Sequence, residues 1–161
     1  MRSLNTPRLT LEPQAEAHAP EMFAVLSDPA LYQFEDQPPP SVAWLQARFA
    51  RLEARGSPDG REQWLNWVLR LKDGSFCGPL IGYVQATVDA NNDAYIAYVL
   101  HSRYWGQGLA SEAVRAMLVA LQDAYQVRMF RAILKRANLR SLHLLARLGF
   151  AACGFGFLSK G

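Results

Sequence analysis

Cysteine and histidine are scarce in this chain of 161 residues. Cys77 and Cys153 show none of the paired spacings of a zinc site, and two cysteines are too few for a disulfide framework. His18, His101 and His143 are scattered, with no His-x-His or His-x-x-x-His spacing among them. We therefore predict that both cysteines are reduced, buried thiols and that the protein holds no metal.

Long apolar runs are also missing from the sequence. None approaches the roughly 18 residues needed to span a membrane, and the first residues lack the apolar centre of a secretory signal. We expect a cytoplasmic protein with no membrane partner.

Lysine is rare, and the excess of positive charge is small. Lysine occurs only at positions 72, 135 and 160, so arginine supplies most of the 17 basic residues, against 14 acidic ones. The net charge of +3 is dispersed and forms no basic stripe with interleaved aromatic residues, which argues against a nucleic-acid partner. Arginine favours bidentate contacts to phosphate or carboxylate, so the composition still suits an anionic ligand.

Hydrophobic residues make up half of the chain, which suits one domain spanning residues 1–161. Their spacing, bounded by proline, glycine and capping residues, indicates the order of the elements. Strands are predicted at 7–13, 64–71, 80–88, 94–100 and 128–135, and helices at 16–27, 41–55, 109–125 and 138–148. The last eleven residues have room for one more strand. This order, without repeats or linkers, predicts an α+β fold.

Two glycines, Gly106 and Gly108, lie between a predicted strand and the long helix that follows. Glycine adopts positive φ at little steric cost, so the pair suits a simple strand-to-helix turn. The same arrangement suits an anion cradle, in which backbone N–H groups and the positive end of the helix face a phosphate. The spacing of the glycines alone leaves both interpretations open.

The pattern Arg103-x-x-Gly106-x-Gly108 resembles the Gln/Arg-x-x-Gly-x-Gly/Ala signature of the GNAT superfamily of acyl-CoA-dependent N-acetyltransferases. Residues 6–11, 104–113 and 138–150 resemble the branch of ribosomal-protein alanine N-acetyltransferases. Together these stretches extend the resemblance over nearly the whole chain. It implies a mixed, mostly antiparallel sheet of six to seven strands, flanked by about four helices, with a splayed central pair of parallel strands.

The resemblance also implies acetyl-CoA as the co-substrate and a site to hold it. Backbone amides of the glycine turn would bind the pyrophosphate of the coenzyme at the helix N-terminus, and part of the basic run 128–140 could meet its 3′-phosphate. The strand that ends at Leu100 would pair with the pantetheine arm, and the amide of Val99 or Leu100 would polarise the thioester carbonyl. The implied cofactor-binding residues are Tyr98, Val99, Leu100, Arg103, Tyr104, Trp105, Gly106, Gln107, Gly108, Leu109, Ala110, Asn138 and Ser141.

Transfer to an amine needs a base, and here the sequence departs from the family. Many relatives carry glutamate in the strand pattern Glu-Ile-Gly-Tyr, whereas this chain reads Tyr95-Ile96-Ala97-Tyr98. Tyr95 therefore stands at the catalytic position, but an ordinary tyrosine pKa of about 10 makes it a poor base at neutral pH, and packing on the sheet is its other interpretation. Further candidates for the base, acting through water, are Glu35, Asp36, Glu62 and His101.

The catalytic acid and the contacts to the acceptor amine are also open in the sequence. Relatives often place a tyrosine four residues before the glycine of the Leu-Gly-Phe motif, where this chain has Leu145. Ser141 is the remaining candidate acid, although it could equally contact only the coenzyme or bond back to its own helix. Phe34 and Glu35 are candidates for contacts to the acceptor substrate, and Trp44 is expected in the core.

The C-terminal end is the last departure from the family. Relatives usually finish with two strands after the Gly-Phe pair, and this chain is expected to end about one strand early. The acceptor groove would then be more open, or a second subunit of a homodimer would cover the exposed edge. The acceptor itself could be a protein N-terminus or a small amine. Because the usual base and acid are missing, a catalytically silent acyl-CoA-binding protein is the alternative to an enzyme.

Overall fold

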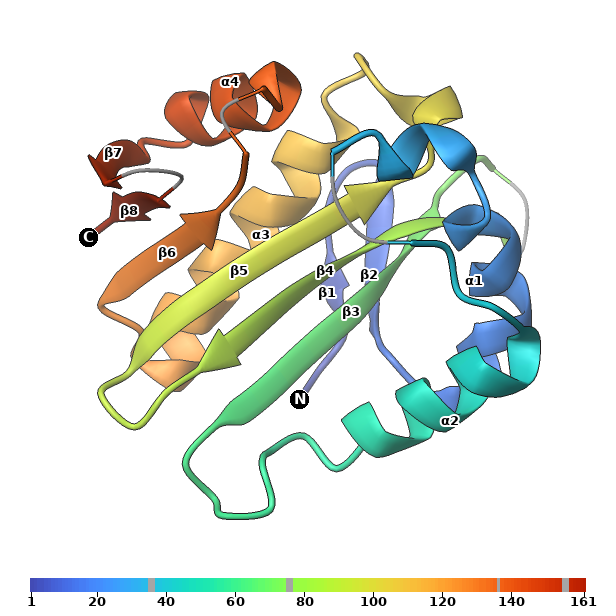
Figure 1. The fold of residues 1–161 in the computed structure, drawn as a ribbon, viewed down its shortest axis with the longest axis horizontal. Helices are drawn as coiled ribbons and strands as arrows, with labels where there is room; N and C mark the ends of the chain where they lie inside the picture. Colours follow the sequence, from blue (N-terminus) through green and yellow to red (C-terminus); the bar gives the residue numbers. More distant parts are fainter. Residues whose placement is uncertain (35–36, 75–76, 136, 155–156) are drawn as a thin grey trace.

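The computed structural model describes residues 1–34, 37–74, 77–135, 137–154 and 157–161, which form one sheet with helices on both faces (Figure 1). The strands are β1 (Leu4–Asn5), β2 (Leu9–Pro13), β3 (Gln63–Leu71), β4 (Leu80–Val88), β5 (Asp93–Leu100), β6 (Met129–Ile133), β7 (Ala151–Gly154) and β8 (Phe157–Lys160). The helices are α1 (Ala19–Leu26), α2 (Val42–Leu52), α3 (Leu109–Tyr125) and α4 (Leu139–Arg147), and short 3-10 turns are η1 (Glu16–His18), η2 (Pro29–Tyr32) and η3 (Ser102–Tyr104).

The sheet has the strand order β1-β2-β3-β4-β5-β6-β8-β7. Its neighbouring strands are antiparallel except for β5 and β6, which run parallel near the middle of the sheet. Two parallel strands need a long crossover between them, and α3 supplies it. The predicted α+β class, the four helices and the central parallel pair are confirmed in the described chain, while the eight strands exceed the predicted six to seven.

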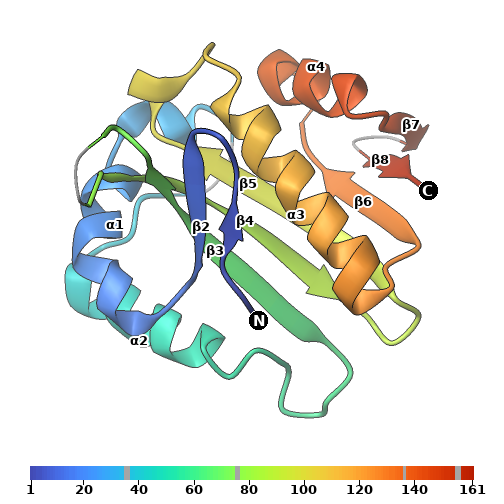
Figure 2. The same ribbon diagram turned by 180° about the vertical axis from the view of Figure 1, so that it is seen from behind.

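Helices cover the two faces of the sheet and create a core on each. In Figure 2, α3 crosses in front of β4 and β5, and it shares the larger core with α4. On the opposite face, α1 and α2 form a smaller core with Val68 of β3 and Leu80 of β4. Residues of β3 alternate between the two cores, because Trp67 and Leu69 belong to the larger one and Val68 to the smaller. Within the described ranges, no helix is both long and apolar enough to cross a bilayer.

Local sequence signals mark the helix ends. The Ser41 hydroxyl accepts a hydrogen bond from the Trp44 amide at 3.1 Å and caps α2, and the Asn138 side chain accepts one from the Ser141 amide at 3.2 Å and caps α4. Gly149 follows α4 with a φ of 88°, a conformation that favours glycine. The predicted helices are therefore correct in place and differ from the observed ones mainly at their ends.

The C-terminal segment differs from the prediction. It contains two short strands, β7 and β8, and β8 pairs with β6 while β7 forms the edge of the sheet. The expectation that the chain ends one strand early is therefore wrong. Strands of four residues carry little alternating pattern of their own, and their pairing with distant segments decides their conformation.

Three side chains are more exposed than predicted. Cys77 and Cys153 are exposed rather than buried. Trp44 on α2 is 47% exposed, so the expectation that it packs in the core is wrong. Its helix turns Leu45 and Phe49 toward the sheet instead, and a helix can bury only one stripe of its surface there.

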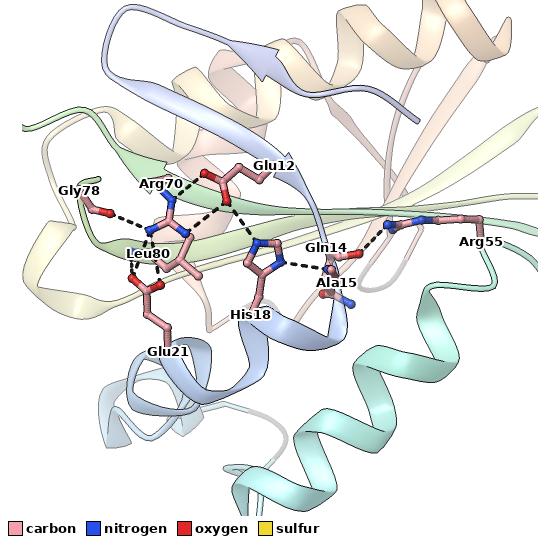
Figure 3. A network of polar contacts seen from close by, with 9 residues as sticks. All are labelled: Glu12, Gln14, Ala15, His18, Glu21, Arg55, Arg70, Gly78 and Leu80. Atoms are coloured by element: carbon pink, nitrogen blue, oxygen red, sulfur yellow. Dashed lines mark hydrogen bonds and ion pairs between the residues drawn. The ribbon is translucent and has the colours of Figure 1, made fainter. Parts of the chain in front are cut away.

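A polar network fastens α1 to the sheet (Figure 3). The Arg70 guanidinium on β3 lies 2.6 Å from a Glu12 oxygen on β2 and 3.4 Å from a Glu21 oxygen on α1. Glu21 also accepts the Leu80 amide at 2.7 Å, and the His18 ring nitrogen Nε2 lies 3.2 Å from Glu12. One arginine thereby joins β2, α1, β3 and, through Glu21, the start of β4.

Replacing this arginine should destabilise the fold measurably. In Arg70→Met we expect the free energy of unfolding to fall by about 1–3 kcal/mol, less than for a fully buried pair because both carboxylates reach solvent. The control is Arg61→Met, since Arg61 and its partner Asp59 are 83% and 60% exposed in their side chains, and we expect a much smaller loss there. Urea denaturation measures both values, and equal losses would show that the network adds nothing beyond a surface ion pair.

Candidate functional site

The two parallel strands pair over only a short length. Residues 93–95 of β5 lie opposite residues 129–131 of β6. Beyond these residues the strands diverge, and Figure 1 shows them moving apart toward the carboxyl end of β5, near α4. This divergence confirms the predicted splayed pair, and the carboxyl ends of parallel strands are where open sheets bind their ligands.

The divergence leaves backbone groups of β5 without a strand partner. The amide of Asp89 donates to the Asp93 carbonyl and the amide of His101 donates to the Ile81 carbonyl, each at 2.9 Å, so the odd-numbered residues of β5 bond to β4. The even-numbered residues, Tyr98 and Leu100 among them, then direct their amides toward β6, which has moved away. Of the two amides suggested by the sequence, at Val99 and Leu100, the alternation therefore favours Leu100.

A glycine on β4 lets the two central strands come close. A Cβ atom built at Gly82 would lie 2.1 Å from the Val99 carbonyl oxygen, so no side chain fits there. The register between β3 and β4 shifts beside this point, which indicates a bulge in the ladder. Gly82 therefore lets β5 lie close to β4 in the part of β5 that no longer pairs with β6.

Two cavities lie in the opening between β5 and α4. One of about 120 Å³ is bounded by Tyr98, Ser141 and Phe34, and a second of about 200 Å³ shares these three side chains and reaches Ala132 of β6. The Tyr98 hydroxyl donates to the Ser141 carbonyl at 3.4 Å. Burial raises the pKa of Tyr98, against smaller opposing effects of the hydrogen bond to Ser141 and of nearby arginines, so this phenol stays protonated well above neutral pH.

The loop between β5 and α3 has the form of an anion cradle. Gly106 and Gly108 have φ angles of 73° and 76°. The first hydrogen bond of α3 runs from the Glu112 amide to the Gly108 carbonyl at 3.0 Å, and no hydrogen bond within the described chain engages the amides of residues 106–111. Unpaired amides at the positive end of a helix are the usual elements of a phosphate site.

Two arginines of α4 face this loop. Together with Gly106 and Gly108, Arg140 and Arg147 bound a cavity of about 290 Å³. The Arg140 guanidinium lies 3.3 Å from the ring centre of Trp105, whose indole N–H donates to the Leu100 carbonyl at 2.7 Å. Trp105 therefore packs beneath the turn, and Arg140 and Arg147 bring two positive charges to the cavity opposite the helix end.

A short strap, residues 28–34, crosses the other side of the cleft. At one end, Asp28 accepts the Ser102 amide at 2.8 Å, just before the glycine loop. Burial acts to raise the pKa of Asp28, but hydrogen bonds from Ser102 and Ala30 and the nearby His101 hold it below its ordinary value. At the other end, the Lys135 ammonium donates to the Phe34 carbonyl. The strap is therefore anchored at both ends, and Phe34, at its second end, lies against the cleft.

The sequence matches the acetyltransferase (GNAT) domain family over residues 8–151. The chain belongs to the GNAT acetyltransferase family. The match covers most of the chain and includes the glycine loop and α4, so the resemblance noted in the sequence is confirmed.

Solved structures agree on the fold of this GNAT domain. The ribosomal L7/L12 α-N-protein acetyltransferase RimL, solved with coenzyme A, superposes with a TM-score of 0.81 at 18% identity and covers 98% of this chain and 97% of its own. The aminoglycoside acetyltransferase AAC(6')-Ib, also with coenzyme A, gives 0.76 at 18% identity, with 94% of each chain covered. The microcin C7 self-immunity acetyltransferase MccE, solved with acetyl-CoA and AMP, gives 0.79 at 18% identity, covering 96% and 93%. A search of curated proteins found no significant match.

The GNAT fold gathers most of the predicted coenzyme residues and leaves three candidate bases elsewhere. Tyr95 lies where β5 still pairs with β6 and is 41% exposed, with the Arg131 guanidinium 6.0 Å from its ring centre. Glu62 precedes β3 at the opposite end of the sheet and accepts the Trp64 indole N–H. His101 accepts the Arg103 amide through Nδ1 and so caps η3.

Two candidate bases, Glu35 and Asp36, lie outside the described residues. No carboxylate or histidine among the described residues bounds the three cavities of this GNAT cleft, and none of the described residues form a group of three or more potential metal ligands. The sequence analysis did not identify Arg147 or the Tyr98 hydroxyl as part of the site. Arg147 could have been predicted, because it lies about one helical turn after Leu144 on the same helix.

Proposed function

We propose that this protein transfers the acetyl group of acetyl-CoA to a primary amine by direct attack within a ternary complex. The observation that carries the proposal is the continuity of the site. A cradle of free amides at the start of α3 leads to a cleft between β5 and α4, which Tyr98, Ser141 and Phe34 bound. A long thioester with a phosphate at one end matches this order of features, and the acceptor would approach from the side of the strap.

The residues present fit acetyl-CoA. Amides of residues 106–111 with Arg140 and Arg147 would hold its phosphates, and the Leu100 amide would polarise the carbonyl to be attacked. Acetyl-CoA supplies an activated thioester, so that a C–N bond forms to the amine as the C–S bond breaks and the departing sulfur takes up a proton. The described chain contributes no carboxylate to the cleft, which suits a donor of high negative charge.

Ser141 is the better candidate for the proton donor. Its side chain bounds two of the cavities, and the Tyr98 hydroxyl beside it is already directed at the Ser141 carbonyl. A hydroxyl in this place would stabilise the departing thiolate by a hydrogen bond and pass it a proton. Tyr98 is the second candidate for the proton donor, because its raised pKa keeps its hydroxyl protonated.

The acceptor class is left open by the relatives. The names of RimL and AAC(6')-Ib refer to a ribosomal protein and to aminoglycosides, so enzymes of this shape serve both a protein N-terminus and a small amine. A second function, a silent acyl-CoA-binding protein, is favoured by one observation, the lack of an acid or histidine among the described residues of the cleft. Release of free coenzyme A with a panel of peptide and aminoglycoside amines supports the enzyme, and tight binding without any release supports the silent protein.

The glycine loop gives the first test. A Cβ at Gly108 would point at Arg8 Nη2, 3.4 Å away, so Gly108→Val should act by straining the left-handed loop conformation and not by filling the phosphate cavity. We expect coenzyme A binding, measured by calorimetry, to weaken at least tenfold. Gly60 has a φ of 71° in an open turn, so Gly60→Val is a control with similar backbone strain far from the cleft. Equal affinities in the two variants would contradict the cradle.

The proton donor gives the second test. In Ser141→Ala we expect kcat to fall by about 10- to 100-fold while the affinity for coenzyme A changes by less than about threefold, because the hydroxyl is needed as the sulfur leaves. Tyr98→Phe is the matched control and should lower kcat less. Steady-state kinetics and calorimetry measure the two quantities, and the reverse order of effects would assign the proton to Tyr98.

The pH dependence gives the third test. If no group of the cleft acts as a strong base, the amine must lose its proton to solvent or through water, and amines have pKa values of about 8–10. We expect kcat/KM for the amine to rise nearly tenfold per pH unit below that value. A plateau that begins below pH 7 would instead reveal a base within the protein, and Glu35→Gln and Asp36→Asn would then be the first variants to measure.

A further inference from the structure

Arg8 reaches the phosphate loop from the far end of the chain. It lies just before β2, and its side chain reaches the loop, where Nη1 donates to the Gln107 carbonyl at 2.8 Å. Its Nε donates to Glu112 Oε2 at 2.7 Å, and its backbone amide donates to Glu112 Oε1 at 2.9 Å. Arg8 therefore holds both the loop and the first turn of α3.

The bond to the Gln107 carbonyl orients the next amide. In a trans peptide the C=O and N–H groups point in opposite directions, so a carbonyl held by Arg8 turns the Gly108 N–H away from Arg8. The glycine at 108 is part of the same arrangement, because a Cβ there would lie 3.4 Å from Arg8 Nη2. The positive φ of Gly108 and the absence of a side chain there thus leave room for the Arg8 guanidinium beside the loop.

The ion pair also changes the charge at the helix end. Glu112 lies in the first turn of α3, where a carboxylate is favoured by the helix dipole but repels any anion bound at the same turn. Burial acts to raise its pKa, yet hydrogen bonds from Thr6 and Arg8 hold that pKa below the ordinary value, so Glu112 is ionised at neutral pH. Arg8 cancels this negative charge.

We propose that Arg8 is a positioning residue for diphosphate recognition, which turns the Gln107–Gly108 peptide and neutralises Glu112 so that the α3 N-terminus accepts the phosphates of the donor. This inference rests on the proposed function. It assigns to the N-terminal hairpin, through Arg8, a part in donor binding.

The test compares Arg8→Gln with Glu112→Gln in calorimetric titrations with coenzyme A. We expect Arg8→Gln to weaken binding at least tenfold, and Glu112→Gln to leave it unchanged or tighter, because that change removes the opposing charge and leaves the bond to Gln107. A merely structural ion pair would make both variants weaker. Arg8→Lys should recover only part of the lost affinity, since a single ammonium cannot reach both Glu112 and the Gln107 carbonyl as the guanidinium does.

A second measurement separates the diphosphate from the rest of the donor. For S-acetylpantetheine, which lacks the diphosphate, kcat/KM should be the same in Arg8→Gln and the unmodified protein, whereas for acetyl-CoA it should fall at least tenfold. Arg70→Gln, which breaks a structural network elsewhere, is the control and should affect both donors equally. Equal losses for both donors in Arg8→Gln would overturn the inference. If the unmodified protein binds coenzyme A and Arg8→Gln binds as tightly, only the inference falls; if the unmodified protein does not bind it, the proposed function falls as well.

Discussion

The rest of the site depends on the parting of β5 and β6. Two parallel strands that pair over residues 93–95 and 129–131 and then separate leave backbone donors facing a gap that neither strand can fill. Unpaired amides are costly when buried, so such a gap is stable only where it is open to solvent or a ligand. Gly82 lets β5 stay close to β4 along the part that no longer pairs with β6.

Long-range polar contacts then hold the walls of the cleft in place. Arg8 ties the hairpin of β1 and β2 to the glycine loop, and Lys135 and Asp28 anchor the two ends of the strap. The network around Arg70 fixes α1, which precedes that strap. Each of these contacts joins a charged side chain to a backbone group or an opposite charge, so charged side chains as well as apolar packing hold the walls of the cleft.

The charge of the cleft separates donor recognition from the chemistry of transfer. Arg140, Arg147 and the helix end favour an anion, and no acid among the described residues of the cavities opposes them. The usual glutamate of the family is replaced by Tyr95, and the structure leaves Tyr95 on the paired part of β5. The described residues of the cleft therefore supply no evident base to remove the proton of the acceptor amine. The pH dependence of the rate reports directly on this step.

The sequence by itself determined the order of the elements, the helix caps at Ser41 and Asn138, the glycine loop and the family. These depend on patterns within a few residues, where propensity and periodicity act directly. It did not reveal the second C-terminal strand, the exposure of Trp44 and the cysteines, or that Tyr95, Glu62 and His101 do not bound the cavities of the cleft. Only the tertiary structure decided these, and with them the meeting of Arg8 with Gln107 and Glu112, which lie 99 and 104 residues away along the chain. Contacts at that separation are set by strand order and register, which a local pattern does not contain.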